Sequence, residues 1–156
     1  MRTATGNKSS ATGINSAGHV VGYGYINTTP SPPSHAFLYN ETGMHDLGDG
    51  GLGGTSARAI GEDDTIVGKV GNFAGIYRNG TWTKLNDLIG DPQVNLFEAT
   101  DINASGQILA YGLDSFPGND TQYHSFILTP VPEPATLGIL TAGGGGGAIV
   151  LRRRRR

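Results

Sequence analysis

Short runs in which larger apolar side chains alternate with small or polar ones recur along this chain and predict β-strands. Val21, Tyr23 and Tyr25 alternate with Gly22 and Gly24, and a period of two places successive side chains on opposite faces of a strand. Similar runs predict strands near residues 20–25, 36–40, 65–70, 74–78, 107–112 and 124–128. The chain is therefore expected to be all-β.

These runs belong to a unit that occurs three times. The segments ATGINSAGHVVG, ARAIGEDDTIVG and ATDINASGQILA align without gaps from Ala11, Ala57 and Ala99. A period in the low forties is typical of propeller blades, which have about four short strands each. We interpret the chain as a disordered start (1–10), two repeats (11–56 and 57–98), a partial third repeat (99–130) and a separate C-terminal segment (131–156).

One position of the repeated unit always holds a small residue. The residue at the position of Gly22 is small in every copy, with Gly68 and Ala110 as its counterparts, which predicts a place where a neighbouring sheet approaches closely.

The number of repeats limits the possible assemblies. Three blades are fewer than the about four to eight of a closed propeller. The units are therefore expected to be part of a larger or incomplete propeller, or a three-blade assembly that a second chain completes.

Composition and charge exclude several classes of function. Five of the 11 basic residues are the terminal arginines, so the rest of the chain sets six basic residues against 13 acidic ones. Such an acidic body does not bind nucleic acid through a basic surface. The chain has no cysteine, which excludes disulfides, cysteine-ligated metals and thiol catalysis.

The chain ends in an uncharged segment followed by arginines. As a helix, the 17 residues 135–151 would reach about 25 Å, just short of a hydrocarbon core of ~30 Å. The glycine run 143–147 costs ~1 kcal/mol of helix propensity per residue. A marginal transmembrane segment and a flexible low-complexity tail are equally good interpretations of these properties. In a membrane segment, the charges that stop translocation would be Arg152, Arg153, Arg154, Arg155 and Arg156.

The segment VPEPAT, the uncharged stretch and the terminal arginines together closely resemble the PEP-CTERM sorting signal of exported bacterial proteins. The resemblance covers residues 131–156, and its three parts stand in order at the terminus. It implies that a membrane enzyme, exosortase, recognises Pro132, Glu133 and Pro134. It also implies an inner-membrane intermediate in a Gram-negative-type bacterium, followed by transfer toward the cell surface.

A sorting tail requires an export signal, but the start MRTATGNKSSATG has no apolar segment of the kind that secretion signals contain. We expect this chain to be the C-terminal part of a longer protein, or to have a misplaced start.

The repeated unit resembles the HAF repeat, a short extracellular bacterial repeat. The resemblance rests on Ile-Asn-x-x-Gly-x-Val-Val-Gly from Ile14, on the triplet His35-Ala36-Phe37 and on a following Asp-Leu-Gly. It spans residues 11–128 and is clearest in the first copy. It implies a β-propeller-like arrangement, often with a PEP-CTERM tail, and implies neither catalytic residues nor a known ligand.

Four histidines invite a search for a site. His35 and His124 occupy the same repeat position, where the second copy has Phe73, which favours a packing or strand-edge position over a ligand. His19 aligns with polar residues of the other copies, which suggests that it faces solvent. No histidine is accompanied by the serine and aspartate of a recognisable hydrolase motif.

Two further patterns favour turns over binding sites. The segment 62–64 (Glu-Asp-Asp) is a conceivable calcium turn, but the ligand spacing of a calcium loop is absent. We therefore expect no metal and no cofactor. Six Asn-x-Ser/Thr triplets are interpreted as turn composition rather than glycosylation; they begin at Asn7, Asn27, Asn40, Asn79, Asn103 and Asn119.

Together these patterns predict a non-enzymatic, exported repeat protein of the cell surface or extracellular matrix, with a structural or adhesive role. The expected partners are an exosortase-type enzyme, the membrane and an extracellular polysaccharide, and no nucleic acid. Two alternatives stay open. One is a sugar- or small-ligand-binding module that uses Tyr23, Tyr25, Trp82 and Tyr111. The other is a fragment of a secreted hydrolase or lyase whose catalytic part lies upstream.

Overall fold

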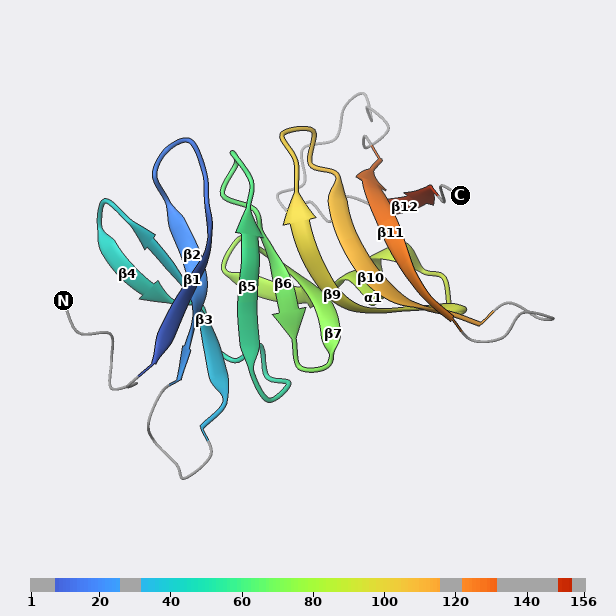
Figure 1. The fold of residues 1–156 in the computed structure, drawn as a ribbon, viewed down its shortest axis with the longest axis horizontal. Coiled ribbons are helices and arrows are strands. Elements are labelled where there is room, and N and C mark those ends of the chain that lie inside the picture. The colour runs from blue at the N-terminus through green and yellow to red at the C-terminus, as the bar shows by residue number, and fades with distance from the viewer. Residues whose placement is uncertain (1–7, 26–31, 116–121, 132–148, 153–156) are drawn as a thin grey trace, which may run out of the picture.

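The computed structural model describes residues 8–25, 32–115, 122–131 and 149–152, and most of these residues lie in β-strands. They form three four-stranded antiparallel sheets (Figure 1). The first and third sheets lie at opposite ends of the molecule, with the second between them. The all-β prediction and all six predicted strands are confirmed. The three sheets do not close into a ring.

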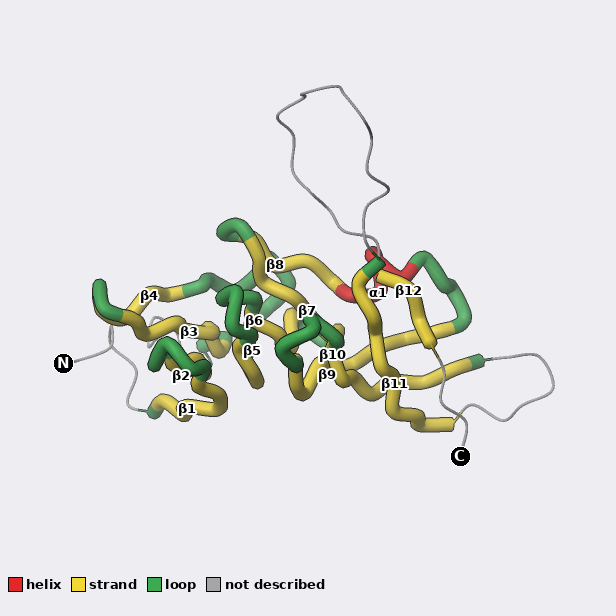
Figure 2. The backbone as a smooth tube through the Cα atoms, turned by 90° about the horizontal axis from the view of Figure 1, so that it is seen from above, coloured by secondary structure: helices red, strands yellow, loops and turns green. Residues whose placement is uncertain are grey.

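In each sheet the strands pair with their neighbours in chain order. The first sheet contains β1 (Ser9–Ile14), β2 (Val20–Tyr25), β3 (Ser34–Asn40) and β4 (Gly43–Asp46). The second contains β5 (Thr55–Ile60), β6 (Ile66–Val70), β7 (Phe73–Arg78) and β8 (Thr81–Lys84). The third contains β9 (Val94–Ile102), β10 (Ile108–Asp114), β11 (Gln122–Pro130) and β12 (Ile149–Arg152). The short helix α1 (Leu85–Ile89) follows β8 and lies beside β12 (Figure 2).

The sheets are joined through the first strand of each following sheet. Strand β5 contacts β1, β2 and β3, and β9 contacts β5, β6 and β7. The first junction buries the apolar side chains of Val21, Ala36, Ala57, Ile60 and Ile66. The second buries a larger set that includes Val67, Ile76, Leu96, Ile102, Ile108, Phe126 and Leu128. The alternation in each strand therefore supplies two apolar layers, one on each face of the second sheet.

The small repeat position is crowded, although the source of the crowding differs from the prediction. An ideal Cβ on Gly22 would lie 2.0 Å from the carbonyl oxygen of Ser10, and one on Gly68 would lie 2.0 Å from that of Ser56. Both oxygens belong to the neighbouring strand of the same sheet, beside a shift in register. A β-bulge within the sheet, and not a second sheet, therefore requires the missing side chain.

The third sheet carries the same crowding two residues further along. Its first two strands have two register shifts instead of one. Ala110 fits at the aligned position, whereas an ideal Cβ on Gly112 would lie 2.2 Å from the carbonyl oxygen of Asn95. The third sheet thus keeps the aligned register shift beside Ala110, and the crowded glycine lies beside the second shift.

Both ends of the described chain differ from the sequence interpretation. Strand β1 begins at Ser9, within the segment expected to be a disordered start. At the other end, Ile149–Arg152 pair with β11 as an extended strand where a helix over 135–151 was expected. Pairing with β11 satisfies the backbone groups of these residues that face it. The remaining residues of that expected helix lie outside the described residues, and no described helix has the length and apolarity to span a bilayer.

Candidate ligand-binding groove

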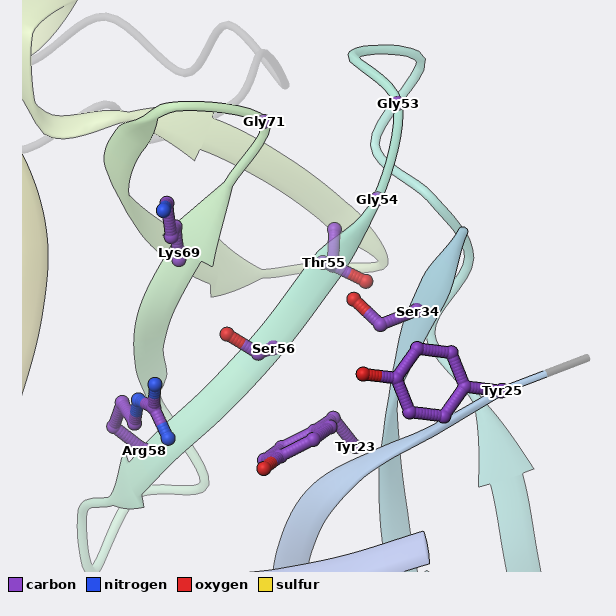
Figure 3. Close-up of a pocket in the computed structure, with 10 residues that line it drawn as sticks. All are labelled: Tyr23, Tyr25, Ser34, Gly53, Gly54, Thr55, Ser56, Arg58, Lys69 and Gly71. Atoms are coloured by element: carbon purple, nitrogen blue, oxygen red, sulfur yellow. The ribbon is translucent and has the colours of Figure 1, made fainter. Parts of the chain in front are cut away.

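An open groove of about 300 Å³ lies between the first and second sheets (Figure 3). Its side chains come from β2, β3, β5 and β6, and the backbone of the glycine-rich connection before β5 lines one end. Its polar and aromatic lining consists of Tyr23, Tyr25, Ser34, Thr55, Ser56, Arg58 and Lys69.

The tyrosine wall follows from the alternation in β2. Tyr23 and Tyr25 share the face on which Val21 enters the core between the sheets, because they follow it at intervals of two. Across the ladder they lie opposite Ala36 and Ser34, whose small side chains leave space beside the rings. Past the core, the same face of the strand therefore presents two aromatic rings to the groove (Figure 3).

The facing wall is formed by β5 and β6. Ser56 and Arg58 both line the groove, with Ala57 buried between them, and Ser56 pairs with Lys69 across the ladder. Thr55 holds the two walls together. Its hydroxyl accepts a hydrogen bond of 2.8 Å from the amide of Ala36 and donates to the carbonyl of Gly48. The groove is thus fixed on both sides by strands rather than by mobile loops.

The two cations of this wall differ in their partners. Arg58 pairs with Glu98 of β9, and its guanidinium lies 5.7 Å from the centre of the Tyr23 ring. Burial acts to lower the pKa of Arg58, but the hydrogen bond and charge of Glu98 outweigh it, so this pKa is raised. Among the described residues, no carboxylate pairs with the ammonium group of Lys69. Lys69 is therefore the cation that is available to a ligand.

The groups of this lining can make the contacts that a sugar offers. Aromatic rings offer apolar faces for the C–H surfaces of a pyranose, and hydroxyl and backbone groups can bond to its hydroxyls. An unpaired ammonium is a partner for a carboxylate or sulfate.

Two of the four aromatic residues proposed from the sequence lie in this groove, Tyr23 and Tyr25. Trp82 does not. Its ring centre lies 5.4 Å from that of Tyr77, and its indole N–H donates 3.1 Å to the carbonyl of Leu47. Trp82 thus belongs to the junction between the first two sheets.

The fourth aromatic candidate, Tyr111, lies on the third sheet, where its hydroxyl donates 3.2 Å to Glu98. Sequence reasoning missed Arg58 and Lys69. Both depart from the repeat, since Arg58 stands where the other copies have threonine and Lys69 where they have tyrosine. Such departures were the available signal.

The position shared by His35 and His124 is a packing position. These two residues and Phe73 occupy equivalent places in the register of their sheets. His35 Nδ1 lies 2.9 Å from Asp46 Oδ1, whereas the second sheet has Lys84 Nζ 4.6 Å from the centre of the Phe73 ring. A histidine–carboxylate pair in one sheet is thus replaced by a cation–π pair in the next. The sequence interpretation of this position agrees with these contacts.

The expectation that His19 faces solvent is wrong. Its side chain is half-buried between two turns: Nδ1 lies 2.7 Å from Asp64 Oδ1 in the turn before β6, and Nε2 lies 3.1 Å from Glu41 Oε1 in the turn between β3 and β4. Hydrogen bonds to Asp64 and then Glu41 raise the pKa of His19. His19 therefore links the first sheet to the second.

Two carboxylates of the acidic turn 62–64 accept hydrogen bonds from the turn between β1 and β2. Glu62 accepts a hydrogen bond of 3.2 Å from the amide of Ser16, and Asp64 accepts one of 3.0 Å from the side chain of Asn15. Within the described ranges, no group of three or more histidine and acidic side chains is arranged to hold a metal ion. The described triplet asparagines, Asn40, Asn79 and Asn103, lie in or beside turns.

The sorting residues Pro132, Glu133 and Pro134, and the arginines 153–156, lie outside the described residues, and Arg152 ends β12. In comparisons with protein-family models, curated proteins and solved structures, this chain matches none of them.

Proposed function

We propose that this protein is an exported cell-surface repeat protein and that it adheres to an extracellular glycan through the groove between its first two sheets. The observation that carries the proposal is an open groove whose lining combines the rings of Tyr23 and Tyr25 with Lys69. Two neighbouring rings and one cation match a sugar chain that bears carboxylates. The groove is open, which allows a polymer to pass through it.

Export and sorting rest on the resemblance of residues 131–156 to the PEP-CTERM signal. In this proposal the partner of the tail is an exosortase-type membrane enzyme, and residues 135–151 enter the bilayer as a helix during sorting. Strand β12 pairs with β11 over only four residues. These residues have to leave the sheet edge before the tail can cross the membrane.

Binding to a polyuronate tests the groove. Polygalacturonate and neutral dextran would be titrated by calorimetry against the full chain and against variants with a changed groove. Tyr25→Ala removes an exposed ring, and Lys69→Gln removes the charge while keeping a polar side chain. We expect each variant to weaken polygalacturonate binding by about tenfold, since a lost ring or ion contact is worth ~1 kcal/mol or more.

Tyr39→Ala is the matched control. Tyr39 is exposed to a similar degree as Tyr25 but lies outside the groove. It should bind polygalacturonate like the parent. Failure of the parent to bind any polysaccharide, or an equal loss in the Tyr39→Ala variant, would contradict the proposal.

A further inference from the structure

The second sheet shows what a fully covered blade looks like in this protein. We call the side of a sheet that meets the preceding sheet its front face, and the side that meets the following sheet its back face. On the front of the second sheet, Ile60 and Ile66 are buried against the first sheet. On its back, Val67 and Ile76 are buried against the third. Both faces are thus apolar and covered.

The back face of the third sheet has the same apolar pair without a cover. Leu109 pairs with Ile127 in the register in which Val67 pairs with Ile76. Leu109 is 42% exposed and Ile127 is 39% exposed. Tyr123, on the same face as this pair, is also exposed. This face therefore retains the residues that receive a following sheet, but no described residue covers them.

The front face of the first sheet is its counterpart. Ile14 is 68% exposed, whereas its equivalents Ile60 and Ile102 are 7% and 8% exposed. Ala11, the first residue of the repeat, is exposed, whereas the corresponding Ala57 is fully buried. The first sheet thus presents the surface with which the second and third sheets dock, while nothing described lies in front of it.

The hydroxyls of two aligned threonines show the same difference between a covered and an uncovered sheet. At the first junction, the hydroxyl of Thr12 donates 2.9 Å to the carbonyl of Ala57 in the following sheet and lies 3.3 Å from the carbonyl of Val21 in its own. The aligned Thr100 keeps only the equivalent of the second contact, 3.3 Å to Leu109. Among the described residues, Thr100 has no contact equivalent to the bond from Thr12 to Ala57. Because Ala57 aligns with Ala11, a first sheet packed against the third would offer the carbonyl of Ala11 as the acceptor.

We propose that a second copy of this chain supplies the missing cover, with the back face of the third sheet of one copy packed on the front face of the first sheet of the other. The contact repeats a junction that this chain already forms twice. The two faces differ, so the interface is heterologous, and such an interface closes into a ring when the rotation permits. Two copies bring six blades together, within the about four to eight of closed propellers.

Sedimentation of the full chain from micromolar to millimolar concentration tests this contact. We expect self-association of the parent. Ile14→Asp on the front face and Leu109→Asp on the back face should each weaken it by about tenfold or more, because a carboxylate would be desolvated in an apolar contact. Both side chains are already exposed, so both variants should retain the circular dichroism of the parent. Leu52→Asp changes an equally exposed leucine in the loop before β5 and is the control.

Mixing the two variants identifies the faces that meet. The Ile14→Asp chain keeps an intact back face, and the Leu109→Asp chain keeps an intact front face, so an equimolar mixture should form a one-to-one pair that neither variant forms alone. A monomeric parent over the whole range would overturn the proposal. So would association that both variants retain, which would point to the tail, or a mixture that stays monomeric.

Discussion

At the scale of the residue, the junction between the first two sheets contains a histidine held between two carboxylates. Asp64 takes a positive φ of 60° in the turn before β6, a conformation that aspartate tolerates better than most residues. The Asp64 carboxylate thereby meets both His19 and the side chain of Asn15. Glu41 approaches the other nitrogen of the His19 ring. The protonated imidazole is the form that suits both partners.

This arrangement predicts a pH-dependent stability. The pKa of His19 is raised above its ordinary value of 6.5, so its contribution is complete below about 6.5 and is lost as the pH rises through the folded-state pKa. Urea unfolding between pH 5 and 9 should show this decline in the parent and a flatter profile in the His19→Gln variant. His45→Gln changes an exposed histidine that bonds within its own turn and should keep the parent profile. Identical profiles for parent and His19→Gln would disprove the role of this contact.

At the scale of the element, the strands were predictable because alternation and repetition are visible in the letters. The bulge was not. A small residue at one repeat position indicates crowding, but it does not show which part of the protein lies close to that position. Only the register shift places the backbone of Ser10 beside Gly22. Arg58 and Lys69 escaped prediction for a related reason. Their significance depends on the stacking of two sheets, which the pattern of a single strand does not contain.

Substitutions of Gly22 and Gly24 in β2 provide a matched test of the bulge. An ideal Cβ on Gly22 would lie 2.0 Å from a backbone oxygen, whereas one on Gly24 would meet nothing closer than 3.4 Å. Gly22→Ala should therefore lower the free energy of unfolding by about 1–3 kcal/mol. Gly24→Ala should leave it unchanged or raise it by up to ~1 kcal/mol, because alanine restricts the unfolded chain. Denaturant titration of both variants measures the difference, and equal losses would mean that the register of β1 and β2 is different.

At the scale of the whole molecule, the chain combines a stacked β body with a tail that resembles a sorting signal. Repetition predicted the order of the sheets, because each copy carries the same strands and turns in the same sequence. Of the groove residues, the sequence indicated Tyr23 and Tyr25, whereas Arg58 and Lys69 were visible only as departures from the repeat. For the tail, the sequence is compatible with a membrane helix and with a flexible tail. The pairing of β12 with β11 adds a third arrangement, in which residues 149–152 form the edge strand of a sheet.

If the tail acts as a sorting signal, changes to its two parts should block sorting at different steps. Pro132→Ala with Glu133→Ala keeps the uncharged segment and the arginines, so this variant should reach the membrane and remain unprocessed there. Replacing residues 152–156 by serine removes charges that each cost about 2.5–3.5 kcal/mol at the bilayer centre, so that variant should cross completely and be released unprocessed. Both require an export signal and a host with the sorting enzyme. Fractionation and the mass of the mature C-terminus distinguish the two failures, and a parent-like result for both variants would leave the tail with no sorting role.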